Sequence, residues 1–375
     1  MALVDLLSIK PENTNIEITE DLLRKDLDRY RELIAYWRMY PDRFVDYLCS
    51  LDPNNTFHFY FYQRLTLRII FRHKYSYAVF CRAYSKSFLS ILSLMLKAIL
   101  YPGAHLFTVA AGKEQSASIV NDKISELCRL IPALSKEIIW DTRGMANAKT
   151  RQTKDSVIYT FKSGSVLENV ACSDKTRGRR FTAGLLEEAA TLQQDILQQV
   201  IIPTLNVSRR LPNGQVDPDE IINQSQTFVT SAGYKNTYAY DRLIQMLCQM
   251  VARPQEAFIF GGDWRIPVKE GLIPGSFVND LKMEGTFNEA TFDREYNSNW
   301  GGDIESAFFS YEVFDRNRIL NLPEYKPSGR NSAKTYYLLG IDVGRFNCTT
   351  EICVFKVSPA PSGEIGRAHV WTPVT

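Results

Sequence analysis

Cysteine and histidine are both scarce in this sequence and are scattered along it. The chain of 375 residues has seven cysteines, at positions 49, 81, 128, 172, 248, 348 and 353, and four histidines. No two cysteines form a C-x-x-C pair, so neither a zinc site nor a disulfide framework has the spacing it needs. Single thiols of this kind indicate a reducing, cytosol-like compartment.

Long apolar runs are absent as well. The first residues show no signal-peptide pattern, and the most apolar stretch, Phe88–Leu100, is interrupted by Ser90, Ser93 and Lys97. This pattern favours a buried core helix and predicts neither secretion nor membrane insertion. The net charge is only +2, so any nucleic-acid contact would need a local basic patch.

Glycine is missing where one motif would most need it. The stretch Tyr77–Cys81 predicts a short buried strand, Arg82–Ser87 a tight polar turn, and the residues after them an apolar helix. A turn that ends in Lys86 and Ser87 is typical of a phosphate-binding loop, because the lysine neutralises phosphate oxygens and the hydroxyl holds Mg²⁺. Ser85 stands where the second glycine of that motif belongs. The alternative is an ordinary strand–helix connection with a solvated lysine.

Three further segments favour a parallel α/β sheet. Ala104–Ala111 predicts a second buried strand, followed by a helix toward Ile131. Ser156–Ala171 alternates as a hairpin with its turn at Ser163–Gly164, and Thr227–Ser231 predicts a short strand that ends in hydroxyls. Strand, turn and long helix in repetition indicate a parallel sheet flanked by helices.

Two consecutive acids end another apolar segment. Thr182–Leu192 predicts a buried strand from whose C-terminal end Glu187 and Glu188 emerge, where ligands bind in open α/β sheets. Nucleotide hydrolysis needs two such groups, so Glu187 is the candidate metal-side acid and Glu188 the candidate base. The alternative is a helix N-terminus decorated with glutamates. The distance along the chain from Lys86 predicts an additional strand between the loop strand and the acid strand.

Other polar residues near these motifs each have two possible roles. Gln63 lies on a predicted helix just upstream of the first strand, where its amide would match an adenine edge, or it is simply a polar helix residue. Arg64, Arg68 and Arg72 share a face of that helix, and a second basic run spans Lys175–Arg180. Each basic set is either a solvated surface or a contact for phosphate groups.

The pattern changes after the sheet. Residues 263–332 are irregular and rich in Gly, Pro, Asn and aromatics, which predicts a connector subdomain and a linker. Tyr336–Ile341 then predicts a buried strand with Asp342 at its end, and Glu351–Val357 a returning strand. An acid on the first strand of such a hairpin is how a two-metal nuclease site starts, although Asp342 is equally well explained as a turn residue.

The final residues differ in kind from the rest. Residues 365–375, IGRAHVWTPVT, are similar to the translation of a sequencing-adapter oligonucleotide in which TGA is read as Trp371. We therefore expect an artefact here. The natural product would continue past Glu364, under a code in which TGA is not a stop, and the partner acids of Asp342 would lie in that continuation.

Taken together, these motifs resemble the large terminase subunit of tailed bacteriophages. Cys81–Ser87 follows the form of that family's arginine-bearing phosphate loop, except for Ser85 in place of glycine. Gln63 matches its upstream adenine-recognition glutamine, and Leu185–Ala190 is similar to its motif of apolar residues followed by two acids. In that motif Glu187 stands where the family more often has aspartate.

Later segments extend the resemblance over about residues 57–357. Thr230–Gly233 is similar to the motif that couples hydrolysis to DNA movement. Phe292–Tyr296 and Gly301–Phe309 look like the connector that precedes the nuclease, and Gly340–Asp342 resembles the opening of an RNase H-like nuclease.

The resemblance implies an α/β fold with two parts. The first is a RecA-like P-loop ATPase of the ASCE type, a parallel sheet flanked by helices, and the second is the first strands of an RNase H-like nuclease domain. The implied domains are an N-terminal helical lid at 1–56, the ATPase at 57–262, the connector and linker at 263–332, and a truncated nuclease start at 333–364.

The resemblance also implies a role for each candidate residue. ATP would be bound by Gln63, Arg82, Ser85, Lys86 and Ser87. Arg82 and Glu188 would act in ATP hydrolysis, Ser87 and Glu187 would hold Mg²⁺, and Thr230 and Ser231 would couple hydrolysis to movement. Asp342 would be catalytic in the nuclease and would bind Mg²⁺ or Mn²⁺ there.

The implied function is an ATP-driven motor that moves double-stranded phage DNA into the procapsid, with an endonuclease that cuts concatemeric DNA. The implied partners are DNA, the portal protein and the small terminase subunit, with the chain in a homo-oligomeric ring on the portal, in the host cytoplasm and away from membranes. Two alternatives remain: a helicase-type P-loop ATPase without a nuclease, and a non-catalytic DNA-binding or virion assembly protein. The strand–turn–strand pattern around Asp342 argues against the helicase type.

Overall fold

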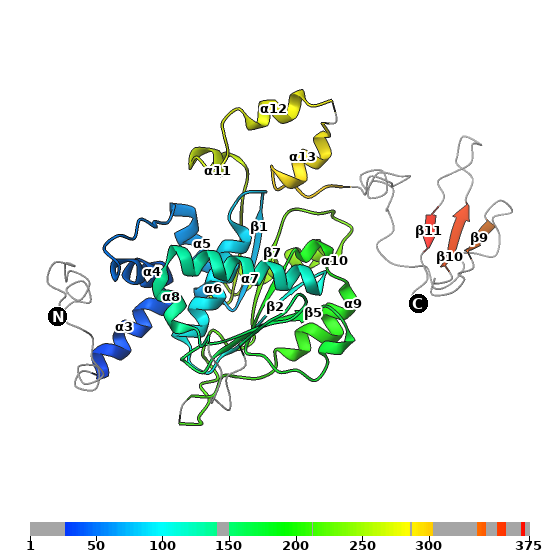
Figure 1. Ribbon diagram of the computed structural model, residues 1–375. Helices are drawn as coiled ribbons and strands as arrows, with labels where there is room; N and C mark the ends of the chain where they lie inside the picture. The colour runs from blue at the N-terminus through cyan, green and yellow to red at the C-terminus, as the bar shows by residue number, and fades with distance from the viewer. Residues whose placement is uncertain are drawn as a thin grey trace. The chain divides into compact units, whose positions relative to one another are not determined.

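The computed structural model describes residues 27–140, 150–211, 213–285, 287–302, 336–342, 351–357 and 369–371. The chain divides into two compact units, one that ends at Gly301 and one that begins at Gly302. Figure 1 labels the helices and strands of both units.

Three helices precede the large sheet: α3 (Leu27–Met39), α4 (Pro41–Ser50) and α5 (Phe61–Arg72). Pro41 separates the first two, because proline fits the first turn of a helix but interrupts the helix before it. Trp37 of α3 packs against Phe44 of α4, with ring centroids 4.7 Å apart. This aromatic contact joins the two helices on either side of Pro41.

The arginines of α5 bind the neighbouring helix. Arg68 donates to both carboxylate oxygens of Asp42, each at 2.7 Å, and Arg64 donates to Asp46 at 2.7 and 2.9 Å. Burial alone would raise the pKa of Asp42, but these guanidinium groups hold it below its usual value. Arg72 donates to the carbonyl of Met39 at 2.9 Å. The basic stripe is thus neither a solvated face nor a phosphate contact, because it joins α5 to the helices before it.

Strands and helices then alternate along the chain, as the sequence predicts. The strands are β1 (Tyr75–Phe80), β2 (His105–Ala110), β3 (Arg151–Gln152), β4 (Val157–Thr160), β5 (Val166–Ala171), β6 (Ala183–Glu187), β7 (Ser225–Thr230) and β8 (Ala257–Gly262). The helices among and after them are α6 (Lys86–Leu100), α7 (Lys113–Leu130), α8 (Pro132–Glu137), α9 (Gln194–Ile196), α10 (Tyr238–Ala252), α11 (Arg265–Lys269), α12 (Phe277–Met283) and α13 (Glu289–Glu295).

The eight strands form one sheet in the order β3-β4-β5-β2-β6-β7-β1-β8. The pairs from β5 through β8 are parallel, whereas β3 and β4 add an antiparallel edge that includes the predicted hairpin. A strand does lie between the loop strand β1 and the acid strand β6. It is β7, which follows β6 in sequence, and not the second strand, because β2 lies on the other side of β6. The predicted α/β class, a parallel sheet flanked by helices, is confirmed.

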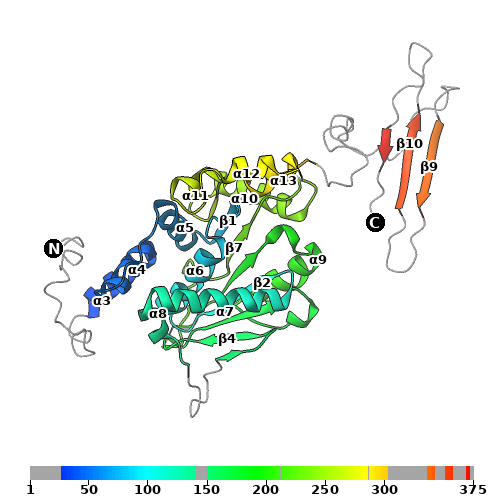
Figure 2. The same cartoon turned by 45° about the horizontal axis from the view of Figure 1, so that its top comes forward.

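Helices cover both faces of this sheet, and each face has its own core. In Figures 1 and 2, α6 and α7 cover one face, while α10 lies behind it. Buried side chains of α5, α6, α7 and α8 form one core cluster, and Tyr77, Phe228 and Met246 belong to a second on the opposite face. Gly184 of β6 leaves room for the Phe107 ring in this second cluster, since a Cβ there would lie 2.3 Å from it.

The apolar run after the loop is a core helix, as predicted. Lys97 of α6 is almost fully buried, and its ammonium group is 3.4 Å from the Ser225 hydroxyl. Burial lowers the pKa of Lys97 to about 8. None of the helices in the described ranges combines the length and apolarity that a membrane crossing requires.

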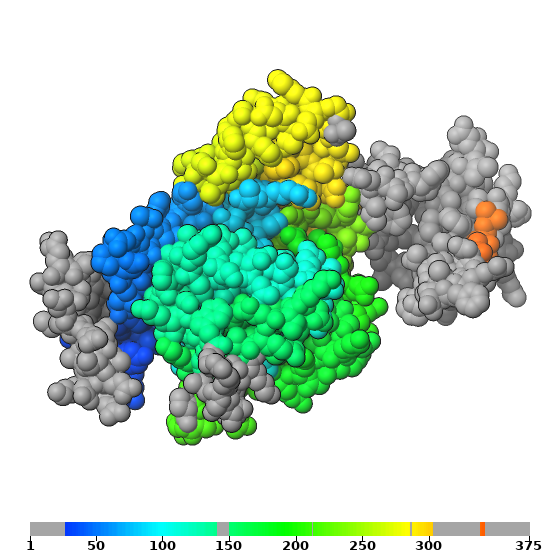
Figure 3. Space-filling view, viewed as in Figure 1, coloured from blue at the N-terminus to red at the C-terminus, as the bar shows by residue number. Residues whose placement is uncertain are grey.

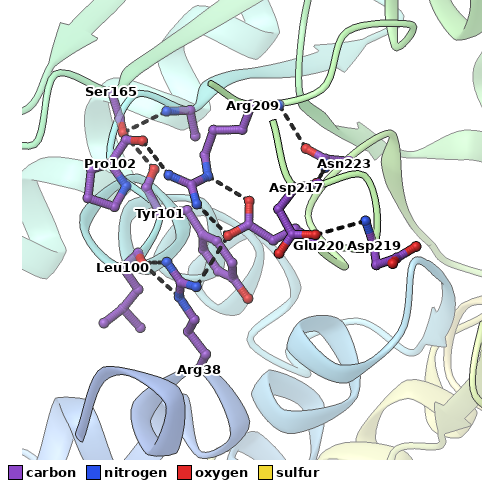
Figure 4. A network of polar contacts seen from close by, with 11 residues as sticks. Arg38, Leu100, Tyr101, Pro102, Ser165, Arg209, Asp217, Asp219, Glu220 and Asn223 are labelled. Carbon is purple, nitrogen blue, oxygen red and sulfur yellow. Dashed lines mark hydrogen bonds and ion pairs between the residues drawn. The ribbon is translucent and has the colours of Figure 1, made fainter. Parts of the chain in front are cut away.

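A polar network fixes the far end of α6 to the N-terminal helices (Figure 4). Arg38 of α3 donates to the carbonyl of Leu100 at 3.0 and 2.8 Å and to Glu220 at 3.2 Å. Arg209, which is 3% exposed, forms a two-point ion pair with Glu220 and donates to the carbonyl of Pro102 at 2.8 Å. A buried guanidinium needs such complete pairing.

The second unit contains a small antiparallel sheet in the order β11-β10-β9. Its strands are β9 (Tyr336–Asp342), β10 (Glu351–Val357) and β11 (His369–Trp371). The predicted strand and its return are both present, with Asp342 opposite Glu351 in the register. The prediction that the first of them is buried is wrong, because Leu338, Leu339 and Ile341 are each more than half exposed. β11 falls within residues 365–375, and the interpretation of that segment as an artefact stays a prediction.

Candidate functional site

The loop between β1 and α6 has an unusual backbone. Ser85 has φ of 59° and ψ of 28°, and Ala83 has φ of 60°, so both adopt the left-handed conformation that glycine adopts most easily. α6 begins at Lys86, directly after this turn. The position that lacks the expected glycine therefore has the conformation that a glycine would favour, and the helix N-terminus faces the loop as in a phosphate-binding site.

Tyr84 anchors the loop to the core. Its ring is 3% exposed and stacks on Phe80 at 4.2 Å between centroids, with the Tyr62 ring 4.5 Å away. Gly262 of β8 leaves space for it, because a Cβ at that position would lie 2.3 Å from the Tyr84 hydroxyl. Aromatic packing thus holds a loop that has no glycine.

Lys86 points to the ends of β6 and β7. Its ammonium group donates to the Ser231 hydroxyl at 2.5 Å and lies 3.4 Å from a carboxylate oxygen of Glu188. Glu188 follows β6 directly, with φ of 47°, and its side chain is 39% exposed. The predicted loop lysine, the predicted base and one predicted coupling residue therefore meet at the C-terminal edge of the sheet.

Thr230 connects the end of β7 to the segment that follows Glu188. It is fully buried at the end of β7, where its hydroxyl donates to the Ser231 carbonyl at 2.8 Å. The same hydroxyl accepts from the backbone N–H of Ala190 at 3.3 Å. Thr230 thus ties the end of β7 to the turn that follows the two acids.

Glu187 is buried at the end of β6, 3% exposed. Burial and the charge of Glu188 raise its pKa to about 7, although a hydrogen bond with Ser87 acts in the opposite direction. One of its carboxylate oxygens, Oε2, is buried without a hydrogen-bond partner. An unsatisfied carboxylate oxygen beside a loop hydroxyl is a ligand set that fits Mg²⁺ together with phosphate oxygens. Within the described ranges, no group of three or more His, Cys, Asp and Glu side chains is placed to hold a metal by itself.

Gln63 lies on the other side of the loop, buried at the start of α5. Its carbonyl oxygen accepts from the N–H of Tyr60 at 3.1 Å. Its amide nitrogen donates to the Ser85 hydroxyl at 3.3 Å and to the Tyr62 hydroxyl at 3.4 Å. The amide is therefore adjacent to the loop, as expected for a base-recognition residue, and is bonded to protein groups on both of its polar atoms.

Arg82 binds an acid outside the loop. It is 64% exposed and forms an ion pair with Glu295 of α13 at 2.8 Å. The basic run further along the chain also binds acidic or polar neighbours. Arg177 pairs with Asp174 at 2.8 Å, and Arg180 donates to Asn206 at 3.1 Å.

The remaining predicted residue belongs to the second unit. Asp342 ends β9, at the position predicted from the sequence. Its side chain lies outside what the structure describes, so its role in a metal site stays a prediction.

Three residues at the site were not anticipated from the sequence. Tyr62 donates or accepts at 3.2 Å with Ser85, and Glu295 binds Arg82. Lys123 of α7 lines a cavity beside the loop together with Gln63. The segment around Glu295 had a sequence signal as part of the connector motif, whereas nothing in the sequence distinguishes Lys123 from other helix lysines.

Comparisons with known proteins add the fold's identity. No protein-family model and no curated protein matches the sequence. Among solved structures, the crystal structure of the bacteriophage HK97 large terminase matches with a TM-score of 0.51 and 13% identity, over 88% of this chain and 66% of that one. The chain thus has the fold of a phage large terminase and spans about two thirds of the HK97 protein's length.

Two other terminase structures match with lower TM-scores. The large terminase ATPase domain of Thermus phage P74-26 has a TM-score of 0.45 and 15% identity, over 69% of this chain and 98% of that domain. The large terminase of another thermophilic bacteriophage, solved in complex with ADP, has a TM-score of 0.44 and 13% identity, over 80% of this chain and 65% of that one.

Proposed function

We propose that this chain is the ATP-hydrolysing part of a phage DNA-packaging motor. The observation that supports this most directly is the meeting of Lys86, Glu188 and Ser231 at the end of three neighbouring strands, with Glu187 buried beside them. Each of these groups has a defined task in phosphoryl transfer.

The tasks follow from position and charge. Lys86 neutralises the oxygens of the β- and γ-phosphates at the N-terminus of α6. Ser87 and Glu187 hold Mg²⁺, which when bound neutralises the charge that develops on the phosphates. Glu188, exposed at the strand end, orients the attacking water. Its position 3.4 Å from Lys86 keeps the carboxylate beside the terminal phosphate.

Three further residues respond to the state of the nucleotide. Ser231 bonds to Lys86, and Thr230 bonds to the turn after the acids, so a change at the γ-phosphate reaches the end of β7 through both. Arg82 would leave Glu295 to contact the γ-phosphate. In this proposal Thr230 and Ser231 couple hydrolysis to movement of DNA.

The wider function rests on the terminase fold. The substrate is double-stranded DNA, which a ring of these subunits, mounted on the portal protein and supplied by the small terminase subunit, moves into a procapsid in the host cytoplasm. Asp342 would belong to an RNase H-like nuclease that uses Mg²⁺ or Mn²⁺. One carboxylate cannot hold two cations, so we expect no DNA cleavage by this chain alone.

The test is Mg²⁺-dependent ATP hydrolysis by the purified chain and by Glu188→Gln. We expect the variant to bind ATP as the wild type does and to lose on the order of a hundredfold or more in turnover, because the amide cannot orient water as a carboxylate does. Glu114→Gln is the matched control, since Glu114 is 61% exposed and pairs with Lys154. Hydrolysis at the wild-type rate in Glu188→Gln would overturn the assignment.

The same measurements separate the alternatives. A non-catalytic DNA-binding or assembly protein would show no ATP binding in a fluorescence titration. A helicase-type ATPase would hydrolyse ATP and separate the strands of a short duplex, whereas a packaging motor leaves the duplex intact.

A further inference from the structure

A cavity of about 660 Å³ opens beside the loop on the Gln63 side. Its walls come from the connection before α5, from the loop residues Ala83 and Ser85, from Phe88 in the first turn of α6, and from one side of α7. Figure 3 shows the face of the first unit on which the surface of α7 lies beside that of the preceding helices. This volume is in the range of cavities that hold nucleotides and similar ligands.

α7 contributes two cations to the wall of this cavity, Lys123 and Arg129, and Lys123 forms an ion pair within the helix. Its ammonium group binds Glu126, one turn further along, at 2.7 Å, and both side chains are about one third exposed, at 33% and 34%. Arg129 lies on the same wall and is exposed, and Asp52 and Glu126 supply the negative charges of the lining. The charge of Lys123 also acts to lower the pKa of Glu187, which places it within electrostatic reach of the metal-side acid.

The position of the cavity relates it to one part of a nucleotide. Lys86, Glu188 and Ser231 lie where the terminal phosphates would be, and Gln63 and Ser85 lie between them and the cavity. A bound nucleotide that extends from the loop toward Gln63 therefore has its α-phosphate and sugar next to α7.

We propose that Lys123 binds the α-phosphate of the nucleotide, so that α7 supplies a second cation in addition to Lys86. The proposal rests on the function proposed above and adds a residue to its binding site. Lysine suits this position because its ammonium is a compact point charge on a flexible stem, which can follow a phosphate oxygen.

The pair with Glu126 leaves Lys123 available for this contact. A partly exposed Lys–Glu pair three residues apart on a helix contributes little to stability, because water screens it and both side chains lose rotamer freedom. The phosphates of a nucleotide together carry more negative charge than Glu126, so they attract Lys123 more strongly than this carboxylate does. Lys123 can therefore leave Glu126 and bind a phosphate with little change in the stability of the protein.

The test compares the binding of ADP and adenosine to the wild type and to Lys123→Ala, Lys123→Arg and Glu126→Gln. ADP affinity is measured by isothermal titration calorimetry, and adenosine affinity by ligand-observed NMR. We expect Lys123→Ala to weaken ADP by roughly tenfold and to leave adenosine unchanged, because only ADP carries phosphate. Lys123→Arg should retain ADP affinity, and Glu126→Gln should retain or increase it.

Lys154→Ala is the matched control, since Lys154 is 84% exposed and pairs with Glu114. Thermal unfolding of every variant identifies any loss of fold. Equal ADP affinity in Lys123→Ala and the wild type would overturn the proposal, as would a parallel loss of adenosine. If the wild type binds adenosine and ADP equally well or binds neither, the proposed function itself fails, which is a different result from a change confined to the variant.

Discussion

Arg82 and Glu295 are 213 positions apart in the sequence and are joined twice in the structure. The Arg82 guanidinium donates to the Glu295 carboxylate at 2.8 Å, and the Arg82 backbone N–H donates to the Glu295 carbonyl at 2.9 Å. The first bond joins the two side chains, whereas the second joins the two backbones and does not require either side chain. The loop between β1 and α6 is therefore attached to α13 by the backbone even when the arginine side chain is elsewhere.

The first prediction concerns this pair. Arg82→Ala should weaken ATP binding by about fivefold or more relative to ADP, because the lost charge would contact only the γ-phosphate. Glu295→Gln should not weaken ATP, because it releases the arginine. Stability should change by less than about 1 kcal/mol in both variants, since the pair is exposed and the backbone bond remains.

Competition binding with ATP and ADP provides the measurement, and urea unfolding gives the stability. An equal loss of ATP and ADP affinity in Arg82→Ala would contradict the γ-phosphate role and leave Arg82 as a link to α13.

The second prediction concerns Ser85. Ser85→Ala keeps the left-handed backbone and removes the hydroxyl that bonds to Gln63 and Tyr62, so it should destabilise the protein by about 1 kcal/mol. Ser85→Gly loses the same hydroxyl but relieves a backbone conformation that costs a non-glycine residue about 1 kcal/mol. We therefore expect Ser85→Gly to be the more stable of the two.

Urea unfolding of both variants at one pH makes the comparison. In Ser85→Gly the Gln63 amide is also released, so ADP should bind at least as tightly as in the wild type. If Ser85→Gly is less stable than Ser85→Ala, the flexibility that glycine adds to the unfolded chain outweighs the relieved strain.

The third prediction is a pH dependence that originates at Glu187. Its folded pKa of about 7 lies above the ordinary value of 4.5, so the folded protein binds this proton more tightly than the unfolded chain does. The stabilising contribution is fully present below about pH 4.5 and is lost as the pH rises through 7. From pH 6 to pH 8 the wild type should lose about 1 kcal/mol more stability than Glu187→Gln.

Denaturation of the nucleotide-free proteins at both pH values measures this difference. The dependence of ADP affinity on Mg²⁺ should become stronger over the same pH range, because the metal requires the carboxylate. Identical pH profiles for the wild type and Glu187→Gln would contradict the assignment of the raised pKa.

The sequence predicted the parts of the fold that depend on local patterns. The apolar run before Glu187 identified β6 and placed the acid at its end, and the alternation in Ser156–Ala171 identified the hairpin of β4 and β5. Local patterns also placed Lys86 at the start of an apolar helix. Each of these depends on neighbours within a few residues.

Relationships between distant segments were not predictable in the same way. The position of β7 between β1 and β6 results from how the crossovers pack, which strand patterns alone leave undetermined. The arginine stripe of α5 met Asp42 because α4 folds back along it. The bond from Gln63 to Ser85 depends on the left-handed turn that the missing glycine made difficult to anticipate.

The network at the far end of α6 has a practical consequence for shortened forms of this protein. A fragment that begins at residue 57, where the ATPase region was predicted to start, lacks both Arg38 and Asp42. Within the described part of the chain, Glu220 then keeps Arg209 as its cationic partner. The carbonyl of Leu100 loses both N–H groups of Arg38, and Arg68 loses the Asp42 carboxylate. The end of α6 that lies opposite the β1–α6 loop would then lose its hydrogen bonds with α3. For expression and crystallisation, the folding unit begins at or before α3.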